Sequence, residues 1–520
     1  MMNEEQRNGM EEGIRQSGNG IYTMTADDTW KQAFSTQPNP AAIYSGTKYA
    51  GKKDTEANRK MKENFSFFGP ATALYALFYA ICMYRNDAGI AFLVFIIATV
   101  VYFFEVMNRL EMKVKKGSCF YLAGMLLLAV STFCTDDQRI IIMNKTGIFL
   151  LMISLLLRQF YNTAEWGLGK YLGSILTTVF GSLEELNQPF QDCKAAMKNG
   201  TKEKKMLVWN ALLGVLVAIP FLIVVVMLLS SADIFFDQLT KSLFNDVDIS
   251  ESSGILWRTA AVFLESYILL VYLCRHTISE EVKDNRTGEP VTAITATGML
   301  TFVYIIFSGI QILGLFLGKL QLPKEYTYAE YAKEGFFQLL AVGILNLVIV
   351  LVCLKYVRES KGLKAVLTVM SVCTYIMIAS SAMRMFMYVQ AYNLTFSRVL
   401  GLWALILLAV LFAGVMMQIF RKDFPLFRYG MAAVTVLYLG LSFAHPDYII
   451  ASVNVQQEKV DYYYLETLNA DAAPVLIPYI AQASKEDFGT RYRSSIAQLE
   501  DGIDPRTFNV SRYRAVQLLQ

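Results

Sequence analysis

The sequence is poor in the residues that build metal centres and disulfide-stabilised domains. It holds only 2 His among 520 residues, which argues against a His-rich metal site. Its 7 Cys form no Cys-x-x-Cys pair, so neither a structural zinc site nor a disulfide framework is predicted. All but Cys193 fall in or beside apolar runs, where cysteine is a small packing residue. We therefore expect no metal and no cofactor.

Recognised catalytic motifs are also missing. The chain has no Gly-x-x-x-x-Gly-Lys-Ser/Thr, no His-Glu-x-x-His and no Gly-x-Ser-x-Gly. This argues against an enzyme of those classes and leaves open a membrane lipid enzyme that uses only Asp, Glu and Tyr. The formal net charge of +3 is too small to indicate nucleic-acid binding.

Long apolar runs are what the chain has in abundance. Hydrophobic residues make up 54% of the sequence, against roughly 45–50% in soluble domains. About eleven runs approach or reach the length that a helix needs to cross a bilayer. Because a spanning segment must satisfy its backbone polar groups internally, each run is predicted to be a helix. The expected spans are 65–84, 89–107, 119–134, 140–157, 206–230, 255–274, 296–317, 336–354, 366–385, 399–419 and 429–444.

The predicted fold is therefore an all-α integral membrane protein, a polytopic bundle of about eleven transmembrane helices with a small helical C-terminal tail. Residues 1–62 are polar and are expected to form a disordered cytoplasmic arm. Residues 63–445 form the bundle, and residues 446–520 form the tail as a small appendage. No signal peptide opens the chain, so the first span is expected to act as an uncleaved targeting signal.

Lys and Arg alternate between the loops in a way that predicts orientation. Cytoplasmic loops carry an excess of these residues. Counting from the N-terminal arm, every second loop is basic, and the loop with Asp233 and Asp237 on the other side is acidic. The pattern places the N-terminus in the cytoplasm and the C-terminal tail outside, in the cell (inner) membrane. The bilayer is the expected partner, together with a membrane or envelope protein.

The stretch 166–198 is neither a clean loop nor a span. Leu168, Leu172, Ile175 and Leu176 follow helical spacing, and charged residues come after them. The pattern predicts either an amphipathic helix on the inner leaflet or a buried cytoplasmic connector.

Polar residues inside spans are candidates for function, because ionisable groups are costly in a membrane. Glu265 lies near the middle of its span, and Gln311 and Asn346 lie within two others. They predict either a polar pathway with a proton relay or hydrogen bonds between helices.

Charged residues also flank the outer ends of spans. Asp233 and Arg384 are expected at similar depth, each among apolar residues, so we predict an ion pair between them. The alternative for Arg384 is that its side chain extends to the headgroups. Glu330 belongs to no obvious helix end and is either a site residue or a solvated charge.

Four ordered motifs resemble those of a bacterial family of multi-pass membrane proteins known only as a domain of unknown function. The resemblance covers roughly residues 65–520 and implies no activity, substrate or cofactor. It implies a bacterial inner-membrane protein. The motifs are Leu228-Leu-Ser-Ser-Ala-Asp233, Tyr328-Ala-Glu-Tyr-Ala with Gly335-Phe-Phe, Ser381-Ala-Met-Arg384, and Asp461-Tyr-Tyr-Tyr-Leu465 with Asp471-Ala-Ala-Pro474.

The predicted topology gathers the polar residues of these regions at the outer face. This outer polar cluster consists of Asp233, Glu330, Arg384, Arg398, Asp447 and Asn454. The sequence thus supports two hypotheses. One is a non-catalytic envelope sensor or accessory subunit that uses the outer cluster, and the other is a transporter or lipid translocase that uses Glu265.

Overall fold

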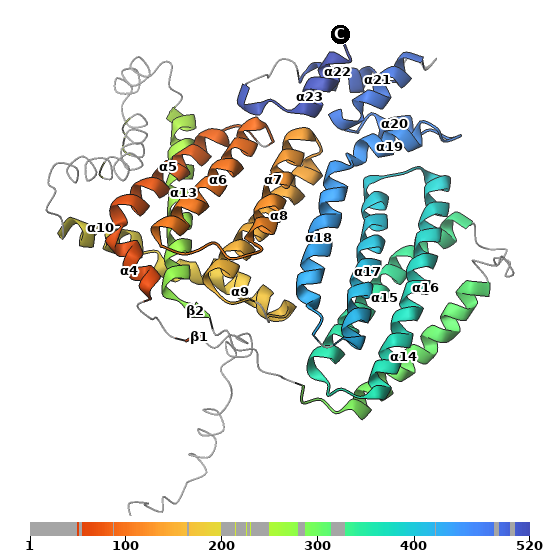
Figure 1. Ribbon diagram of the computed structural model, residues 1–520. Coiled ribbons are helices and arrows are strands. Elements are labelled where there is room, and N and C mark those ends of the chain that lie inside the picture. Colours follow the sequence, from red (N-terminus) through yellow and green to blue (C-terminus); the bar gives the residue numbers. More distant parts are fainter. Residues whose placement is uncertain are drawn as a thin grey trace, which may run out of the picture. The chain divides into compact units, whose positions relative to one another are not determined.

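The computed structural model describes most of the chain beyond the N-terminal arm. Nearly all of these residues are helical, and the strands among them are β1 (Tyr49–Ala50) and β2 (Thr277–Ile278), which pair antiparallel (Figure 1). The described residues are 49–50, 55–86, 88–163, 166–198, 214, 225, 229, 249–278, 286–313, 328–421, 423–482, 488–499 and 505–520.

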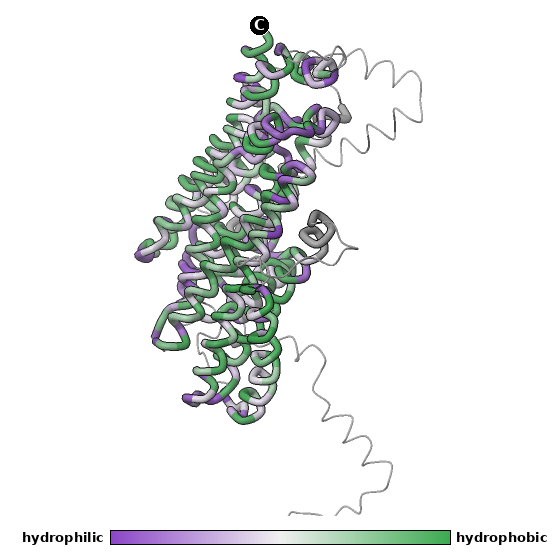
Figure 2. Tube along the Cα trace, turned by 90° about the vertical axis from the view of Figure 1, so that its right-hand side faces the viewer, coloured by the Kyte–Doolittle hydropathy of each residue, from purple (hydrophilic) through white to green (hydrophobic). Residues whose placement is uncertain are grey.

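Nine helices in the described part of the chain are long and apolar enough to cross a membrane. Apolar residues cover their middles, and hydrophilic residues gather in the turns and the tail (Figure 2). The predicted all-α membrane fold is therefore confirmed. The nine are α5 (Phe65–Cys82), α6 (Ile90–Arg109), α8 (Gln138–Phe160), α13 (Ile249–Arg275), α14 (Pro290–Gln311), α15 (Tyr328–Tyr356), α16 (Lys361–Tyr392), α17 (Phe396–Phe420) and α18 (Leu426–Phe443).

Two of the eleven expected spans are not among these nine. The third corresponds to α7 (Ser118–Cys134), an apolar helix of 17 residues that is shorter than the others. Of the fifth, at 206–230, the structure describes only residues 214, 225 and 229. Of the arm predicted at 1–62, residues 1–48 and 51–54 lie outside the described residues, and its end forms helix α4 (Glu56–Glu63).

Helices α5, α6, α7, α8 and α13 form the first half of the bundle. Each packs on the next in the order α13, α5, α6, α7, α8, and we call this arrangement the five-helix ring. Phe68, Met125 and Tyr267 are fully buried in its core. Polar side chains inside it are paired, as where Thr72 Oγ1 lies 2.7 Å from Tyr102 OH between α5 and α6.

Helices α14 to α17 form the second half. Helix α16 packs on α14, α15 and α17, and Val350, Met370 and Val415 are buried between them. Helix α18 packs on both α17 and α7 and so connects the two halves. At that junction Ser442 Oγ on α18 lies 2.6 Å from Ser131 Oγ on α7.

The tail folds against one end of the bundle rather than standing free as an appendage. Its buried residues Leu465, Leu476 and Tyr492 join one apolar cluster with Phe336 and Met385 of the bundle. This shared core makes the tail part of the fold. Its helices are α19 (Pro446–Asn454), α20 (Tyr462–Leu465), η3 (Ala470–Ala472), α21 (Ala473–Gln482), α22 (Thr490–Ala497), η4 (Pro505–Thr507) and α23 (Val510–Gln517).

The loops separate into two sets, one at each end of the bundle. At the tail end, Asn86, the turn 135–137 and Leu394 all hydrogen-bond to tail residues. At the opposite end, the loop 110–117 accepts a bond from Gln159, and Tyr161 donates to the His276 carbonyl. These are the two sets of loops that the Lys and Arg pattern separates.

The connector after α8 is helical and has one buried and one exposed apolar face. It consists of α9 (Leu168–Gly181), η1 (Ser182–Glu185) and α10 (Gln188–Lys198). One face of α9 is buried through Tyr171 and Ile175. The other face exposes apolar residues four positions apart, which are Leu168, Leu172, Leu176 and Phe180.

Candidate functional site: a charged latch between the tail and the bundle

The turn between α7 and α8 presents two adjacent aspartates to the tail. Asp137 is the N-cap of α8, and its Oδ1 accepts the Arg139 backbone N–H at 2.9 Å. The same carboxylate accepts the Arg139 side chain through Nε and Nη2, both at 2.8 Å. This bidentate pair fixes the Arg139 guanidinium at the tail end of the bundle.

Arg139 connects the bundle to the tail. Its Nη2 also donates to Asp447 Oδ1 of α19 at 2.6 Å, across 308 positions of sequence. The guanidinium lies 3.9 Å from the ring centre of Phe396. The side chains of Asp137 and Asp447 are 1% and 2% exposed, whereas that of Arg139 is 42% exposed. One partly exposed guanidinium is therefore shared by two buried carboxylates.

Asp471 makes a second connection between the same turn and the tail. Its Oδ1 accepts the Asp136 backbone N–H at 2.9 Å, and its Oδ2 accepts the Thr135 hydroxyl. His445 Nδ1 lies 3.3 Å from the same Oδ2. Because Asp471 is 4% exposed, these bonds replace the water that its carboxylate loses.

The C-terminal helix closes the cluster from its other side. Arg512 Nε donates to Asp136 Oδ1, and Asn509 Nδ2 donates to the Thr135 carbonyl at 2.8 Å. Asn509 also caps α23 by accepting the N–H groups of Ser511 and Arg512. We call the whole set the tail latch; it consists of Thr135, Asp136, Asp137, Arg139, His445, Asp447, Asp471 and Arg512.

The four aspartates of the latch differ in their electrostatics. Burial raises the pKa of Asp447 to about 6, with a further rise from Asp137 that Arg139 opposes. Burial also raises the pKa of Asp136, against the opposing effect of Arg512. At Asp471, burial is outweighed by hydrogen bonds from His445, Ser511, Thr135 and the Asp136 N–H, so its pKa is lowered.

The arrangement is suited to holding two parts of the chain together. The latch carboxylates bond to residues of the latch and its surroundings, and four carboxyl groups face two guanidinium groups. Among the described residues, no group of three or more His, Cys, Asp or Glu is placed to hold a metal ion. The interactions that the site shows are charge pairs and hydrogen bonds between the tail and the bundle.

Three residues of the predicted outer cluster lie at the tail end. Asp447 belongs to the latch. Asn454 is 1% exposed and bonds to the Leu394 backbone twice, accepting from its N–H at 2.7 Å and donating to its carbonyl at 2.9 Å. Arg398 donates to the Tyr392 and Asn393 carbonyls at the end of α16. The last two side chains hold the turn between α16 and α17.

Arg384 lies deeper, among α14, α15 and α16. Its Nη2 donates to Gln311 Oε1 at 3.1 Å, and Ser380 Oγ donates to the same oxygen at 2.6 Å. Gly335 on α15 leaves the space for the guanidinium, because a Cβ there would lie 1.6 Å from Arg384 Nη1. The structure thus brings Arg384 together with Gln311, a residue expected at mid-membrane.

A substitution at Gly335 tests this packing. Gly335→Ala is expected to lower the free energy of unfolding by about 1–3 kcal/mol, since the methyl group must displace a buried guanidinium. Gly298→Ala on α14 is the matched control, because no described residue outside its own helical turn places an atom within 4 Å of its Cβ position. It should be neutral or slightly stabilising. Equal thermal stability of the two variants in detergent would contradict the placement of Arg384.

Of the remaining predicted site residues, the described ones belong neither to the tail latch nor to the contact between Arg384 and Gln311. Asn346 is fully buried and donates to Thr374 Oγ1 at 3.0 Å, between α15 and α16. Glu265 is exposed on α13 and faces away from the core of the five-helix ring. Glu330 lies in the first turn of α15, where only the backbone is described, and Asp233 lies outside the described residues. The predicted Asp233–Arg384 pair stays a prediction.

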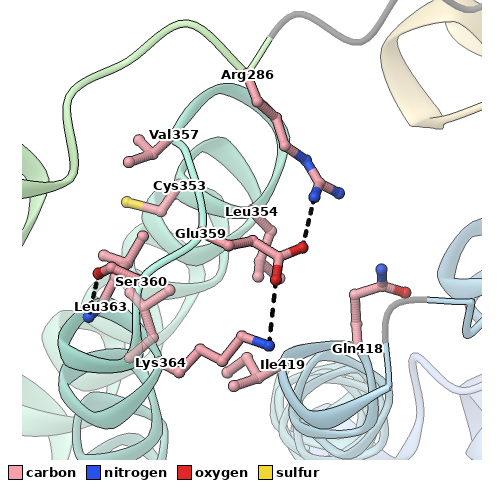
Figure 3. A pocket seen from close by; sticks show the side chains of 11 residues that line it. Arg286, Cys353, Leu354, Val357, Glu359, Ser360, Leu363, Lys364, Gln418 and Ile419 are labelled. Carbon is pink, nitrogen blue, oxygen red and sulfur yellow. Dashed lines mark hydrogen bonds and ion pairs between the residues drawn. The ribbon is translucent and has the colours of Figure 1, made fainter.

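A pocket of about 30 Å³ lies at the end of the bundle opposite the tail (Figure 3). On its wall, Glu359 accepts from Arg286 Nη1 at 2.7 Å and lies 3.3 Å from Lys364 Nζ. A space of this size holds about one or two waters. The pocket therefore marks the joint between α15 and α16 rather than a ligand site.

Sequence reasoning missed most of the latch. Asp136, Asp137, Arg139, His445 and Arg512 were not among the expected site residues. One signal was present: Thr135-Asp-Asp-Gln-Arg139 places three charges in a four-residue stretch between two apolar runs on the predicted outer side. The partners in the tail are more than 300 positions away, and no periodicity links them.

These helices and this latch define a polytopic helical membrane protein whose C-terminal segment is folded onto one end of its bundle. The chain belongs to the family described as Domain of unknown function (DUF4153), whose model matches residues 122–479. The resemblance to an uncharacterised membrane family is thereby confirmed. No curated protein and no solved structure gives a significant match.

Proposed function

We propose that the protein is a non-catalytic sensor or accessory subunit of a bacterial inner membrane, acting at its extracytoplasmic face. The observation that carries this proposal is the latch. A buried cluster in which carboxylates outnumber guanidiniums joins the tail to the bundle. The carboxyl groups of the latch can be protonated or ionised, so the strength of the contact between tail and bundle responds to conditions or partners at that face.

The proposed topology has eleven spans, a cytoplasmic N-terminus and an extracytoplasmic tail. The Lys and Arg pattern supports it, because Lys113, Lys115 and Lys116 lie at the end opposite the tail. The described segments on either side of residues 199–248 lie near opposite ends of the bundle. Helix α10 packs near Tyr267 and Arg275, whereas the other end of α13 lies near Met83 at the tail end.

The connector fits the same topology. Its helix α9 lies at the opposite end, where Tyr171 packs against Phe427 at the start of α18. Its exposed stripe of Leu168, Leu172, Leu176 and Phe180 suits insertion into the cytoplasmic leaflet. We propose that α9 lies in that interface with its buried face on the bundle.

The alternative function is a transporter or lipid translocase that uses Glu265. The exposure of Glu265 on the outer surface of the five-helix ring makes it a poor lining residue for a path through the described helices. This favours the sensor.

A physiological assay separates the two functions. A deletion strain is complemented with wild type, Arg139→Gln or Glu265→Gln at matched membrane levels. The transcriptional response to envelope acidification is then compared with solute accumulation. The sensor predicts an altered response for Arg139→Gln, with Glu265→Gln and solute accumulation like wild type. A transport defect that Glu265→Gln fails to restore would instead support the transporter.

A further inference from the structure

The five-helix ring encloses a cavity of about 100 Å³. The hydroxyls of its tyrosines are paired, since Tyr75 OH lies 3.2 Å from Thr99 Oγ1 and Tyr102 OH lies 2.7 Å from Thr72 Oγ1. A buried water needs polar partners of this kind, so an apolar occupant fits better. Every helix of the ring contributes to the lining, including Tyr75, Val100, Met125, Leu155 and Leu270.

The loosest contact in the ring lies beside the cavity. The ring closes least tightly between α8 and α13. These two helices meet near the end opposite the tail, where Leu157 and Leu273 share a cluster. Farther along, Met152 on α8 and Ser266 on α13 line the cavity instead. A lipid chain entering between α8 and α13 would pass directly from the membrane into the cavity.

Basic residues stand at the end of the ring nearest the cavity. The loop 110–117 joins α6 to α7, both of which line the cavity, and it exposes Lys113 and Lys116. Arg158, two residues beyond the lining residue Leu156, bonds to the Lys116 carbonyl. These cations suit a phosphate at headgroup level.

We propose that the five-helix ring binds an anionic glycerophospholipid of the surrounding bilayer. One acyl chain fills the cavity, and the headgroup phosphate lies at Lys113, Lys116 and Arg158. Apolar lining, a lateral route and positive charge at the rim together select a lipid rather than a soluble ligand. The site is separate from the tail latch and does not depend on the sensor function.

The test is native mass spectrometry of the full-length protein in detergent, titrated with phosphatidylglycerol or phosphatidylcholine. Wild type is expected to retain one phosphatidylglycerol in preference to phosphatidylcholine. Val100→Phe fills the cavity and should weaken retention by at least about tenfold, a loss of roughly 1.4 kcal/mol. Val101→Phe is the matched control, because the neighbouring Val101 is 62% exposed and should bind like wild type.

Two further variants keep the proposal falsifiable if Val100→Phe folds poorly. Val100→Leu adds less volume and should weaken retention by less. Lys113→Gln combined with Lys116→Gln should remove the preference for phosphatidylglycerol, whereas Arg358→Gln with Lys361→Gln, elsewhere at the same end, should preserve it. Retention that is equal in the Val100 and Val101 variants, or unaffected by the Lys113 and Lys116 pair, would overturn the proposal.

Discussion

Replacing Arg139 by Gln is expected to release the tail from the bundle. Asp137 and Asp447 would then share a buried site without their common cation. Breaking a buried pair typically costs about 3–5 kcal/mol, and the partial exposure of Arg139 points to the lower end of that range. Thermal unfolding in detergent and limited proteolysis of the tail measure the effect.

Two variants control for this result. Arg59→Gln removes an exposed partner of Glu63, with side chains 67% and 64% exposed, and should change stability by less than about 1 kcal/mol. Arg139→Gln combined with Asp447→Asn should recover part of the loss, because one unpaired carboxylate is removed. A tail that stays protected in Arg139→Gln would show that the apolar cluster alone holds it.

Asp447→Asn and Asp471→Asn are expected to have opposite pH dependences. The folded pKa of Asp447 is raised from 3.8 to about 6, so its contribution to stability is lost as pH rises through about 6. The amide that Asp447→Asn introduces does not ionise, so the variant does not lose this stability as pH rises. Relative to wild type, Asp447→Asn should therefore gain about 2–3 kcal/mol between pH 4 and pH 8.

For Asp471 the sign is reversed. Its folded pKa is lowered, so its contribution is present above the unfolded value of 3.8 and is lost as pH falls through the folded pKa. Asp471→Asn should be most harmful at neutral pH and least harmful in acid. Unfolding temperatures of the two variants across pH 2 to 8 give the comparison, because the Asp471 transition lies below pH 3.8 and the Asp447 transition above it. If the unfolding temperatures of the two variants changed with pH in parallel, the two carboxyl groups would occupy similar environments.

The sequence predicts the spans well because bilayer thickness imposes length and composition on each helix. The run expected at 89–107 is helix α6 (Ile90–Arg109), and the run expected at 399–419 lies within α17 (Phe396–Phe420). The helical character of the tail was also predicted, and the Asn509 cap at the start of α23 is a local signal of the same kind. Local chemistry therefore accounts for the elements.

What the sequence does not show is which elements meet. The tail reads as a polar appendage, yet Leu465 and Leu476 are fully buried against the bundle. Likewise, the sequence does not indicate that Arg384 lies beside Gln311 and Gly335, as it does in the structure. These pairings depend on how helices far apart in sequence pack, which neither hydropathy nor periodicity encodes.

The central claim is that the tail is folded onto the extracytoplasmic end of the bundle. The rings of Phe133 on α7 and Phe508 in the tail lie 6.0 Å apart, so these two positions report the contact. Phe133→Cys and Phe508→Cys would be combined with Cys134→Ser, and intact spheroplasts treated with a short, membrane-impermeant bismaleimide. A control pairs Phe508→Cys with Lys116→Cys at the opposite end.

Mass spectrometry then identifies linked peptides. We expect a link between positions 133 and 508 without permeabilisation, and none between 116 and 508. A 133–508 link that forms only after permeabilisation would place the tail in the cytoplasm, and no link under either condition would show that the tail is not docked; either result would contradict the claim.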